Sequence, residues 1–118
     1  MKYLCLVYAD EAALASCPDE ECLAYFESVS DSGHCQVAEA LESVQTATTV
    51  RVRAGSLSVT DGPFAETKEQ LTGFYLIEAQ DLNEAIQLAG RIPPARYGSI
   101  EVRPVRNLAG RVRNADGL

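Results

Sequence analysis

The chain has 118 residues, 47% of them hydrophobic, and carries 10 Lys plus Arg against 17 Asp plus Glu, for a formal net charge of −7. This composition fits one folded domain with an apolar core and excludes global disorder, and the six Arg within 91–118, facing two acids, are too few for a nucleic-acid-binding surface. The apolar runs span only a few residues, whereas a membrane helix needs about 20, so we expect a soluble, unprocessed, cytoplasmic protein without a membrane partner.

The first part of the chain predicts a strand, a helix and a second strand. Residues 2–9 are almost continuously hydrophobic and rich in β-formers, which is typical of a central strand covered on both faces. Ser16 and Pro18, followed by three acids, mark a helix start, and Gly33 marks its end. Between these limits the apolar residues recur at helical spacing, at Cys22, Leu23, Phe26 and Val29. The pattern then loosens into a short strand within 35–44.

Residues 48–60 have the pattern of a β-hairpin. Side chains alternate between polar and apolar from Thr48 to Arg53, as in a half-exposed strand. Ala54 and Gly55 form the turn, and the returning strand contains Leu57, Val59 and Thr60.

The last part of the chain predicts a strand, a helix and a final strand. Residues 73–78 are the strand, and Asp81 and Glu84 have the spacing of a helix-capping box. An apolar stripe follows until Pro93 stops the helix, and residues 100–105 form the last strand.

The order of these elements predicts an α+β fold. A β-α-β unit, a hairpin and a second β-α-β unit match a ferredoxin-like split βαβ arrangement, in which two helices cover one face of an antiparallel sheet. The other face of such a sheet is apolar and needs a cover, and a second copy of the chain is the simplest one. We therefore expect a homodimer with a ligand cavity beside the sheet, built from a single domain over 1–106 and followed by a polar tail over 107–118.

The four cysteines do not have the spacing of a metal site. Cys17 and Cys22 are separated by four residues, but the other candidate ligands, His34 and Cys35, are adjacent and would point to opposite faces of a strand. Disulfides are not expected without a secretory signal, and Cys5, between two leucines, is expected to be a small buried hydrophobe.

A long motif in the second half of the chain resembles a known family. The run from Asp61-Gly62-Pro63-Phe64 through Glu66-Thr67-Lys68-Glu69-Gln70 to Gly73-Phe74-Tyr75 is similar to the DGPF branch of the YCII-related domain family. Further matches cover nearly the whole chain, at Met1-Lys2-Tyr3-Leu4, Gly33-His34, 46–51, Arg91-Ile92-Pro93 and 98–105. Thr72 departs from the family pattern, where a second glycine is usual.

The resemblance carries expectations about fold, partners and chemistry. It implies a dimeric α+β barrel, which agrees with the element order derived above. Members are often encoded beside extracytoplasmic-function sigma factors, so a sigma factor is an implied partner. Related YCII-type proteins carry a His and Asp pair proposed as catalytic, and the single histidine here is His34.

His34 and Asp61 are therefore the candidate catalytic residues. A carboxylate on one ring nitrogen would orient the imidazole and leave the other nitrogen to exchange protons with a substrate. The alternative is structural: His34 ends the first helix, and Asp61 caps the turn that contains Pro63 through its own backbone.

The connection after this turn holds candidate substrate-binding residues. Glu66, Thr67 and Lys68 could line a polar mouth, with Lys68 attracting an anionic group, or they could form a solvated link with weak surface ion pairs.

Phe64 and Tyr75 could form an aromatic wall of the binding site, although aromatic residues beside strands also belong to cores. Arg103, in the last strand, is a second candidate anion anchor or a residue of a solvent-exposed face.

Three functional hypotheses follow. The first is a cofactor-free enzyme that uses His34, Asp61 and an anion-holding Lys68 or Arg103 on a small polar or anionic molecule. The second is a non-catalytic ligand-binding or regulatory protein, and the third is an interaction module whose cavity is filled by side chains. No nucleophile elbow, dinucleotide or phosphate-loop motif is present in the sequence, so no cofactor is expected.

Overall fold

The computed structural model describes residues 1–15 and 17–108 of the chain. Its elements follow in the order β1 Lys2–Ala9, α1 Glu11–Leu14, α2 Asp19–Asp31, β2 Cys35–Ala40, η1 Val44–Thr46, β3 Thr48–Arg53, β4 Ser56–Asp61, β5 Gln70–Glu78, α3 Leu82–Ala89, η2 Pro93–Arg96 and β6 Ser99–Pro104. Most of the predicted polar tail, from residue 109 onward, lies outside the described residues. Within the described part, no helix is long and apolar enough to cross a membrane.

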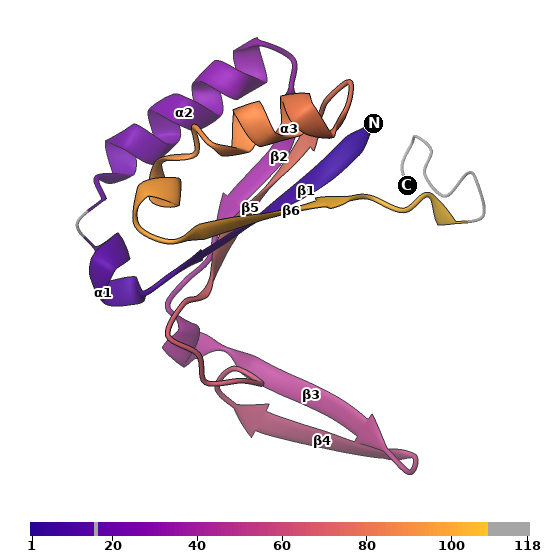
Figure 1. The fold of residues 1–118 in the computed structure, drawn as a ribbon. Coiled ribbons are helices and arrows are strands. Elements are labelled where there is room, and N and C mark those ends of the chain that lie inside the picture. Colours follow the sequence, from indigo (N-terminus) through magenta and orange to yellow (C-terminus); the bar gives the residue numbers. More distant parts are fainter. Residues whose placement is uncertain (16, 109–118) are drawn as a thin grey trace.

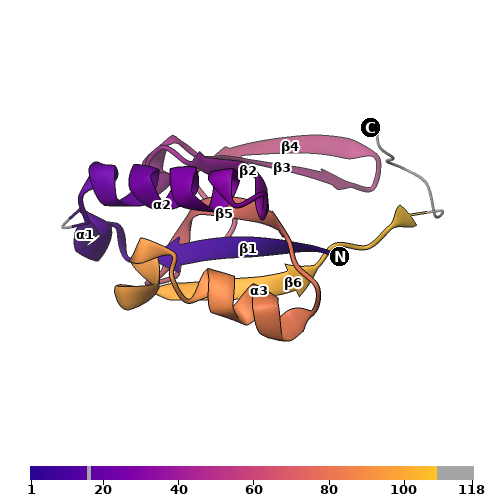
Figure 2. The ribbon, with the colours of Figure 1, turned by 90° about the horizontal axis from the view of Figure 1, so that it is seen from above.

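Four strands form the main sheet in the order β2-β5-β1-β6, and every neighbouring pair is antiparallel. Helices α2 and α3 lie on the same face of this sheet, α2 over β2 and β5 and α3 over β1 and β6 (Figure 1, Figure 2). The predicted α+β, ferredoxin-like split βαβ arrangement is therefore confirmed.

Local signals explain the ends of the long helices. The first turn of α2 follows Pro18 and contains three acids, whose charges favour the positive end of the helix dipole. At α3, the Asp81 side chain accepts a hydrogen bond from the Glu84 N–H at 2.9 Å, and Glu84 Oε1 accepts one from the Gln80 N–H at 2.7 Å. The first bond satisfies a backbone donor that the helix itself leaves unpaired, and the second ties the residue before the N-cap to the first turn.

One helical segment was not predicted. Helix α1 has four residues and begins where Asp10 accepts a hydrogen bond from the Ala12 N–H at 3.0 Å. The Glu11 carboxylate then accepts hydrogen bonds from the Val44 N–H at 2.6 Å and from Ser43 Oγ at 3.0 Å. These contacts join the chain just after β1 to the segment that follows β2.

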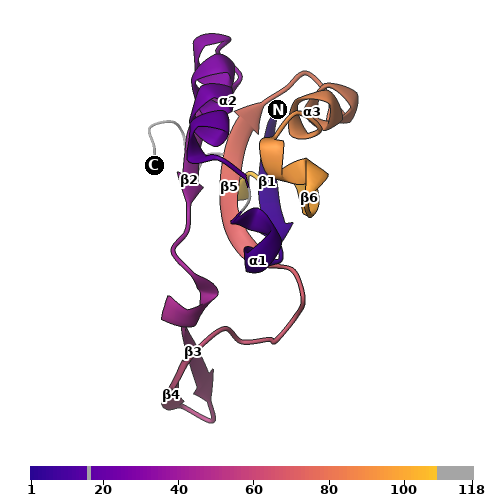
Figure 3. The same cartoon turned by 90° about the vertical axis from the view of Figure 1, so that its left-hand side faces the viewer.

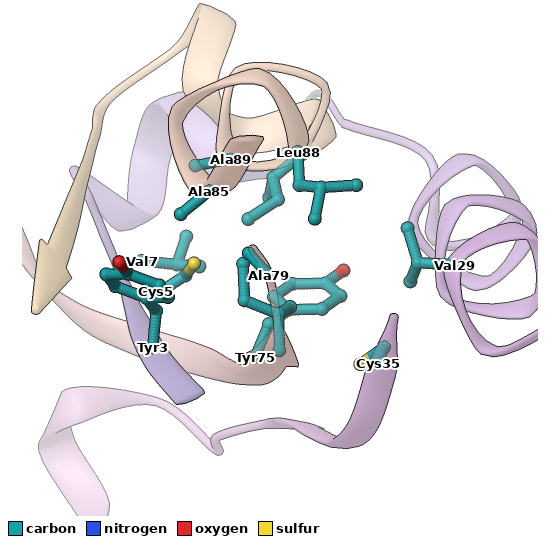
Figure 4. Packing of buried hydrophobic residues seen from close by; sticks show 12 residues of the cluster. Tyr3, Cys5, Val7, Val29, Cys35, Tyr75, Ala79, Ala85, Leu88 and Ala89 are labelled. Atoms are coloured by element: carbon teal, nitrogen blue, oxygen red, sulfur yellow. The ribbon is translucent and has the colours of Figure 1, made fainter. Parts of the chain in front are cut away.

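The hydrophobic core lies between the sheet and the helices. Alternate residues of β1 and β5 point toward α2 and α3, and their partners come from both helices (Figure 4). The Tyr25 hydroxyl donates to the Leu88 carbonyl at 2.6 Å and so connects α2 with the end of α3. The buried cluster contains Tyr3, Cys5, Val7, Val29, Cys35, Tyr75, Ile77, Ala79, Ala85, Leu88, Ala89 and Ile92.

The opposite face of the sheet carries apolar side chains, and no helix of the described residues lies over them. These alternate residues of the two central strands are only partly buried, and we call the set the open sheet face: Leu4, Leu6, Tyr8, Phe74 and Leu76. On the neighbouring edge strand, Val37 is 43% exposed. Apolar area of this kind favours association with another surface.

The hairpin arm, β3 and β4 together, projects away from the main sheet (Figure 1, Figure 3). Its predicted turn is confirmed: Ala54 and Gly55 have φ values of 52° and 79°, as a two-residue primed turn requires. One face of the arm is apolar and formed by two cross-strand pairs, Val50 with Val59 and Val52 with Leu57.

Candidate functional site

A cavity of about 390 Å³ lies between the N-terminal part of α2 and the strands β2 and β5. Its size is within the range of small-molecule sites, and its walls are mostly apolar. It is lined by Val7, Leu14, Cys17, Asp19, Cys22, Leu23, Phe26, Ala38, Glu39, Ala40, Thr72, Gly73, Phe74, Tyr75 and Pro94. The cavity is on the helix-covered face of the sheet, so the same alternation that builds the core also directs side chains into it.

Tyr75 is the principal polar side chain of this cavity. Only 8% of the residue is exposed, and its ring packs edge-on against Tyr25 with centroids 5.5 Å apart. Within the described residues, the Tyr75 hydroxyl makes no hydrogen bond. Burial raises the pKa of this phenol, with a smaller contribution from the nearby Cys22, so the hydroxyl stays protonated and remains a donor at neutral pH.

The floor of the cavity depends on a close approach between β2 and β5. A Cβ atom at Gly73 would lie 2.8 Å from the Glu39 carbonyl oxygen, which leaves room only for glycine. The neighbouring Thr72 hydroxyl donates to the Val7 carbonyl at 3.3 Å, so its polar group is already satisfied by the sheet. Thr72 therefore shapes the floor without offering a free hydrogen-bond donor.

Two thiols meet in the wall beside α2. Cys17 Sγ is 3.9 Å from Cys22 Sγ and 3.6 Å from Glu21 Oε1. Burial, followed by the contact with Cys22, raises the pKa of the Cys17 thiol to about 11. Cys17 precedes the N-cap residue and Cys22 occupies the fourth helical position, which are the two positions of a hydrophobic staple.

His34 lies outside the cavity lining, between the end of α2 and the start of α3. Its Nδ1 is 2.9 Å from Ser32 Oγ, which itself donates to the Val29 carbonyl, and its Nε2 is 3.3 Å from Glu84 Oε2. Because a neutral imidazole has one N–H, it can donate to only one of these two acceptors at a time. The ring therefore bridges two helix ends.

The structure does not bring His34 and Asp61 together within one chain. Asp61 ends β4, where its backbone pairs with Thr48 in the projecting hairpin arm. His34 precedes the first residue of β2, whereas the arm follows the other end of β2 (Figure 1). The carboxylate partner of the imidazole is Glu84, 50 residues along the chain. The physical reason is that the arm leaves the main sheet before Asp61 is reached.

The other sequence-predicted site residues also lie away from the cavity. Phe64 is 78% exposed, and Lys68 is exposed in the same connection between the arm and β5. In that connection Glu66 is exposed, and the Thr67 hydroxyl donates to the Glu69 carbonyl at 2.7 Å. Arg103 is exposed on β6 opposite Leu4.

Of the residues predicted to form the site, Tyr75 alone lines the cavity, and sequence reasoning did not single out Cys17, Asp19, Cys22 or Phe26 for this role. A signal for two of these residues was present, because Cys22 and Phe26 are four apart on the inward stripe of α2.

Comparisons with known proteins agree with this architecture. A relative from Rhizobium meliloti (strain 1021), an uncharacterised protein, is 39% identical over 114 residues, covering 89% of this chain and 92% of its own. Among solved structures, the 5-chloro-2-hydroxyhydroquinone dehydrochlorinase of Burkholderia phenoliruptrix AC1100, in complex with 2,5-dihydroxybenzoquinone, superposes with a TM-score of 0.55 at 17% identity. That alignment covers 91% of this chain and 95% of the dehydrochlorinase chain, and it shows a shared fold.

The family model for the YCII-related domain matches residues 1–109, a range that includes every residue the structure describes. Together with the relative at 39% identity, this match places the protein in the YCII-related domain family.

Proposed function

We propose that this protein binds a small, planar, hydroxylated aromatic molecule in the cavity between α2 and the sheet. The observation that carries the proposal is the hydroxyl of Tyr75, a buried residue of the mostly apolar cavity wall, which has no hydrogen-bond partner among the described residues. Leaving a buried hydroxyl without a partner costs about 1–3 kcal/mol. A ligand oxygen that accepts this hydrogen bond recovers that free energy and also fixes the orientation of the ligand.

The lining favours a neutral ligand. Asp19 and Glu39 are the ionisable acids among the lining residues, and no Lys, Arg or His is among them. An anionic molecule would therefore lack a counter-charge in the cavity, whereas an aromatic ring can pack against Phe26 and Leu14. This replaces the sequence-based hypothesis of an anionic substrate held by Lys68 or Arg103. The 2,5-dihydroxybenzoquinone in the dehydrochlorinase structure shares the planar, oxygen-substituted ring, although its own hydroxyls are acidic.

We propose that the functional unit is a homodimer. The open sheet face is apolar, and the projecting hairpin arm carries an apolar face of its own. An isolated two-stranded hairpin is only marginally stable in water, so the arm gains most by packing on another surface. A second copy of the chain supplies apolar area that can cover the open sheet face and the apolar face of the arm.

A cofactor-free enzyme remains the second candidate function. It is favoured by the dehydrochlorinase of the same fold and by the His34 side chain, which is held on both ring nitrogens. In this alternative His34 supplies acid–base chemistry, and Glu84, its carboxylate partner in the structure, takes the place of the sequence-based Asp61. The regulatory alternative, with an extracytoplasmic-function sigma factor as partner, rests on the resemblance to the DGPF branch.

Binding can be tested with resorcinol, a stable dihydroxybenzene, against benzoate as an anionic ring and cyclohexanol as a non-planar alcohol. We expect resorcinol to raise the unfolding temperature and to perturb the amide NMR signals of cavity residues, and we expect the other two to have weaker effects. Tyr75→Phe removes only the hydroxyl and should weaken resorcinol binding about tenfold. Tyr3→Phe is the matched control, because the Tyr3 hydroxyl contacts Met1 Sδ outside the cavity lining.

Equal affinity in the wild type and Tyr75→Phe, or preference for benzoate, would contradict the proposed site. Product analysis of the same mixtures separates binding from catalysis. Recovery of an unchanged ligand supports a binding protein. A product that forms with the wild type but not with His34→Ala supports the enzyme.

A further inference from the structure

We infer that Cys17 and Cys22 are a redox modification site: a thiol pair that closes to a reversible disulfide in the wall of the cavity. The separation of their sulfur atoms, 3.9 Å, is van der Waals contact and exceeds an S–S bond by about 2 Å, so the two atoms that must bond already touch. Both thiols are free in the structure. The proposal does not depend on the nature of the cavity ligand.

The local fold explains why these two side chains meet. Residues at the staple positions of a helix are brought into contact by the entry of the chain, normally to pack two apolar groups. Here both positions carry sulfur, so the packing contact is also a dithiol. Cys5 and Cys35 differ: they belong to the central core, and within the described residues neither sulfur has a thiol contact of this kind.

The surroundings indicate how the pair reacts and with what class of oxidant. Cys22 is partly exposed while Cys17 is buried, so a small disulfide reaches Cys22 first. The first turn of α2 holds Asp19, Glu20 and Glu21, so an uncharged disulfide approaches more easily than an anionic one.

The chemistry is thiol–disulfide exchange in two steps. The Cys22 sulfur loses its proton and attacks one sulfur of the small disulfide, forming a mixed disulfide and releasing one thiol. The Cys17 sulfur then attacks Cys22, its proton passing to the second thiol that leaves. One small disulfide is reduced to two thiols, and the two cysteines are oxidised to one S–S bond. Because burial holds Cys17 in its thiol form, the second step should accelerate as the pH rises above neutrality.

The test uses the full-length reduced protein with 2-hydroxyethyl disulfide at pH 8, followed by alkylation of the remaining thiols. Cleavage after Glu20 or Glu21 cuts the chain between the two cysteines, so a closed disulfide yields two peptides held together until reduction. We expect loss of two thiols per chain, a linked Cys17–Cys22 peptide pair, and full reversal by dithiothreitol.

Variants separate this result from general oxidation. Cys17→Ser should stop at the mixed disulfide on Cys22, and Cys35→Ala should form the disulfide as the wild type does. Four outcomes would overturn the proposal. Two are wrong links: a disulfide that involves Cys5 or Cys35, or a disulfide between two chains. The other two are incomplete reactions: a wild-type reaction that stops at the mixed disulfide, or survival of both thiols in the presence of the oxidant. The peptide map of the wild type decides the matter even if a variant fails to fold.

Discussion

The main sheet and the hairpin arm differ in how many of their faces are apolar. In both, successive side chains of antiparallel strands point to opposite faces, but β1 and β5 are apolar on both faces, whereas the arm has one apolar and one polar face. On β5, Ile77 is 2% exposed beneath the helices, whereas the four apolar residues of the arm are between 58% and 67% exposed. The comparison teaches that alternation specifies which residues share a face, while the elements packed on that face decide whether the strand is stabilised by burial.

The largest effect should come from the buried side of this comparison. Ile77→Ala leaves a cavity under α2 and α3 and should lower the free energy of unfolding by about 4 kcal/mol. Val52→Ala, a truncation in the arm, should cost less than about 1 kcal/mol in dilute protein, because its side chain already contacts water. Denaturant unfolding of both variants measures the difference. Similar losses for the two would show that the arm is as buried as the core.

The second prediction concerns the partner of the arm. Val52→Asp places a charge on the apolar face and should weaken dimer formation about 30-fold or more, while circular dichroism shows the protomer still folded. Ser58→Asp adds the same charge to the opposite face of the arm and is the matched control. Light scattering over a concentration series gives the dimer dissociation constants of the two variants. A Val52→Asp dimer as tight as the wild type would place the dimer contact elsewhere.

The smallest effect is expected at the turn of the arm. Ala54 has φ 52°, a left-handed conformation that alanine adopts at a cost and that asparagine tolerates better. Ala54→Asn should therefore stabilise the arm by up to about 1 kcal/mol, measured as slower hydrogen exchange of the β3 and β4 amides. Unchanged protection would mean that the partner surface, and not the turn, determines the stability of the arm.

Much of the fold could be predicted from sequence because its signals are local. The signals act within a few residues: the hydrophobic, β-rich run of β1, the capping pair of Asp81 and Glu84, and the Ala54-Gly55 turn. Helix α1 escaped prediction because its four residues are too few for a periodic signal, and its Glu11 contacts Val44, 33 residues away.

The candidate site could be predicted only in part, for the same reason. The cavity collects residues from β1, α1, α2, β2, β5 and η2, and a pattern on one element does not reveal which elements converge. Tyr75 was identified as an aromatic residue of a strand, and its inward direction follows from the alternation of β5. Asp61 was predicted as the partner of His34 by resemblance. The carboxylate that lies beside the imidazole in the structure belongs to Glu84, because α3 packs beside the end of α2.

The strand order has a consequence for synthesis of the chain on the ribosome. Strand β1 is the most hydrophobic segment to emerge, yet both of its neighbours, β5 and β6, begin at Gln70 or later. During translation, residues 2–9 must therefore wait for most of the chain before any native strand can pair with them, while the hairpin arm can form as soon as it is made. The nascent protein accordingly passes through a stage in which its future central strand is a target for chaperones.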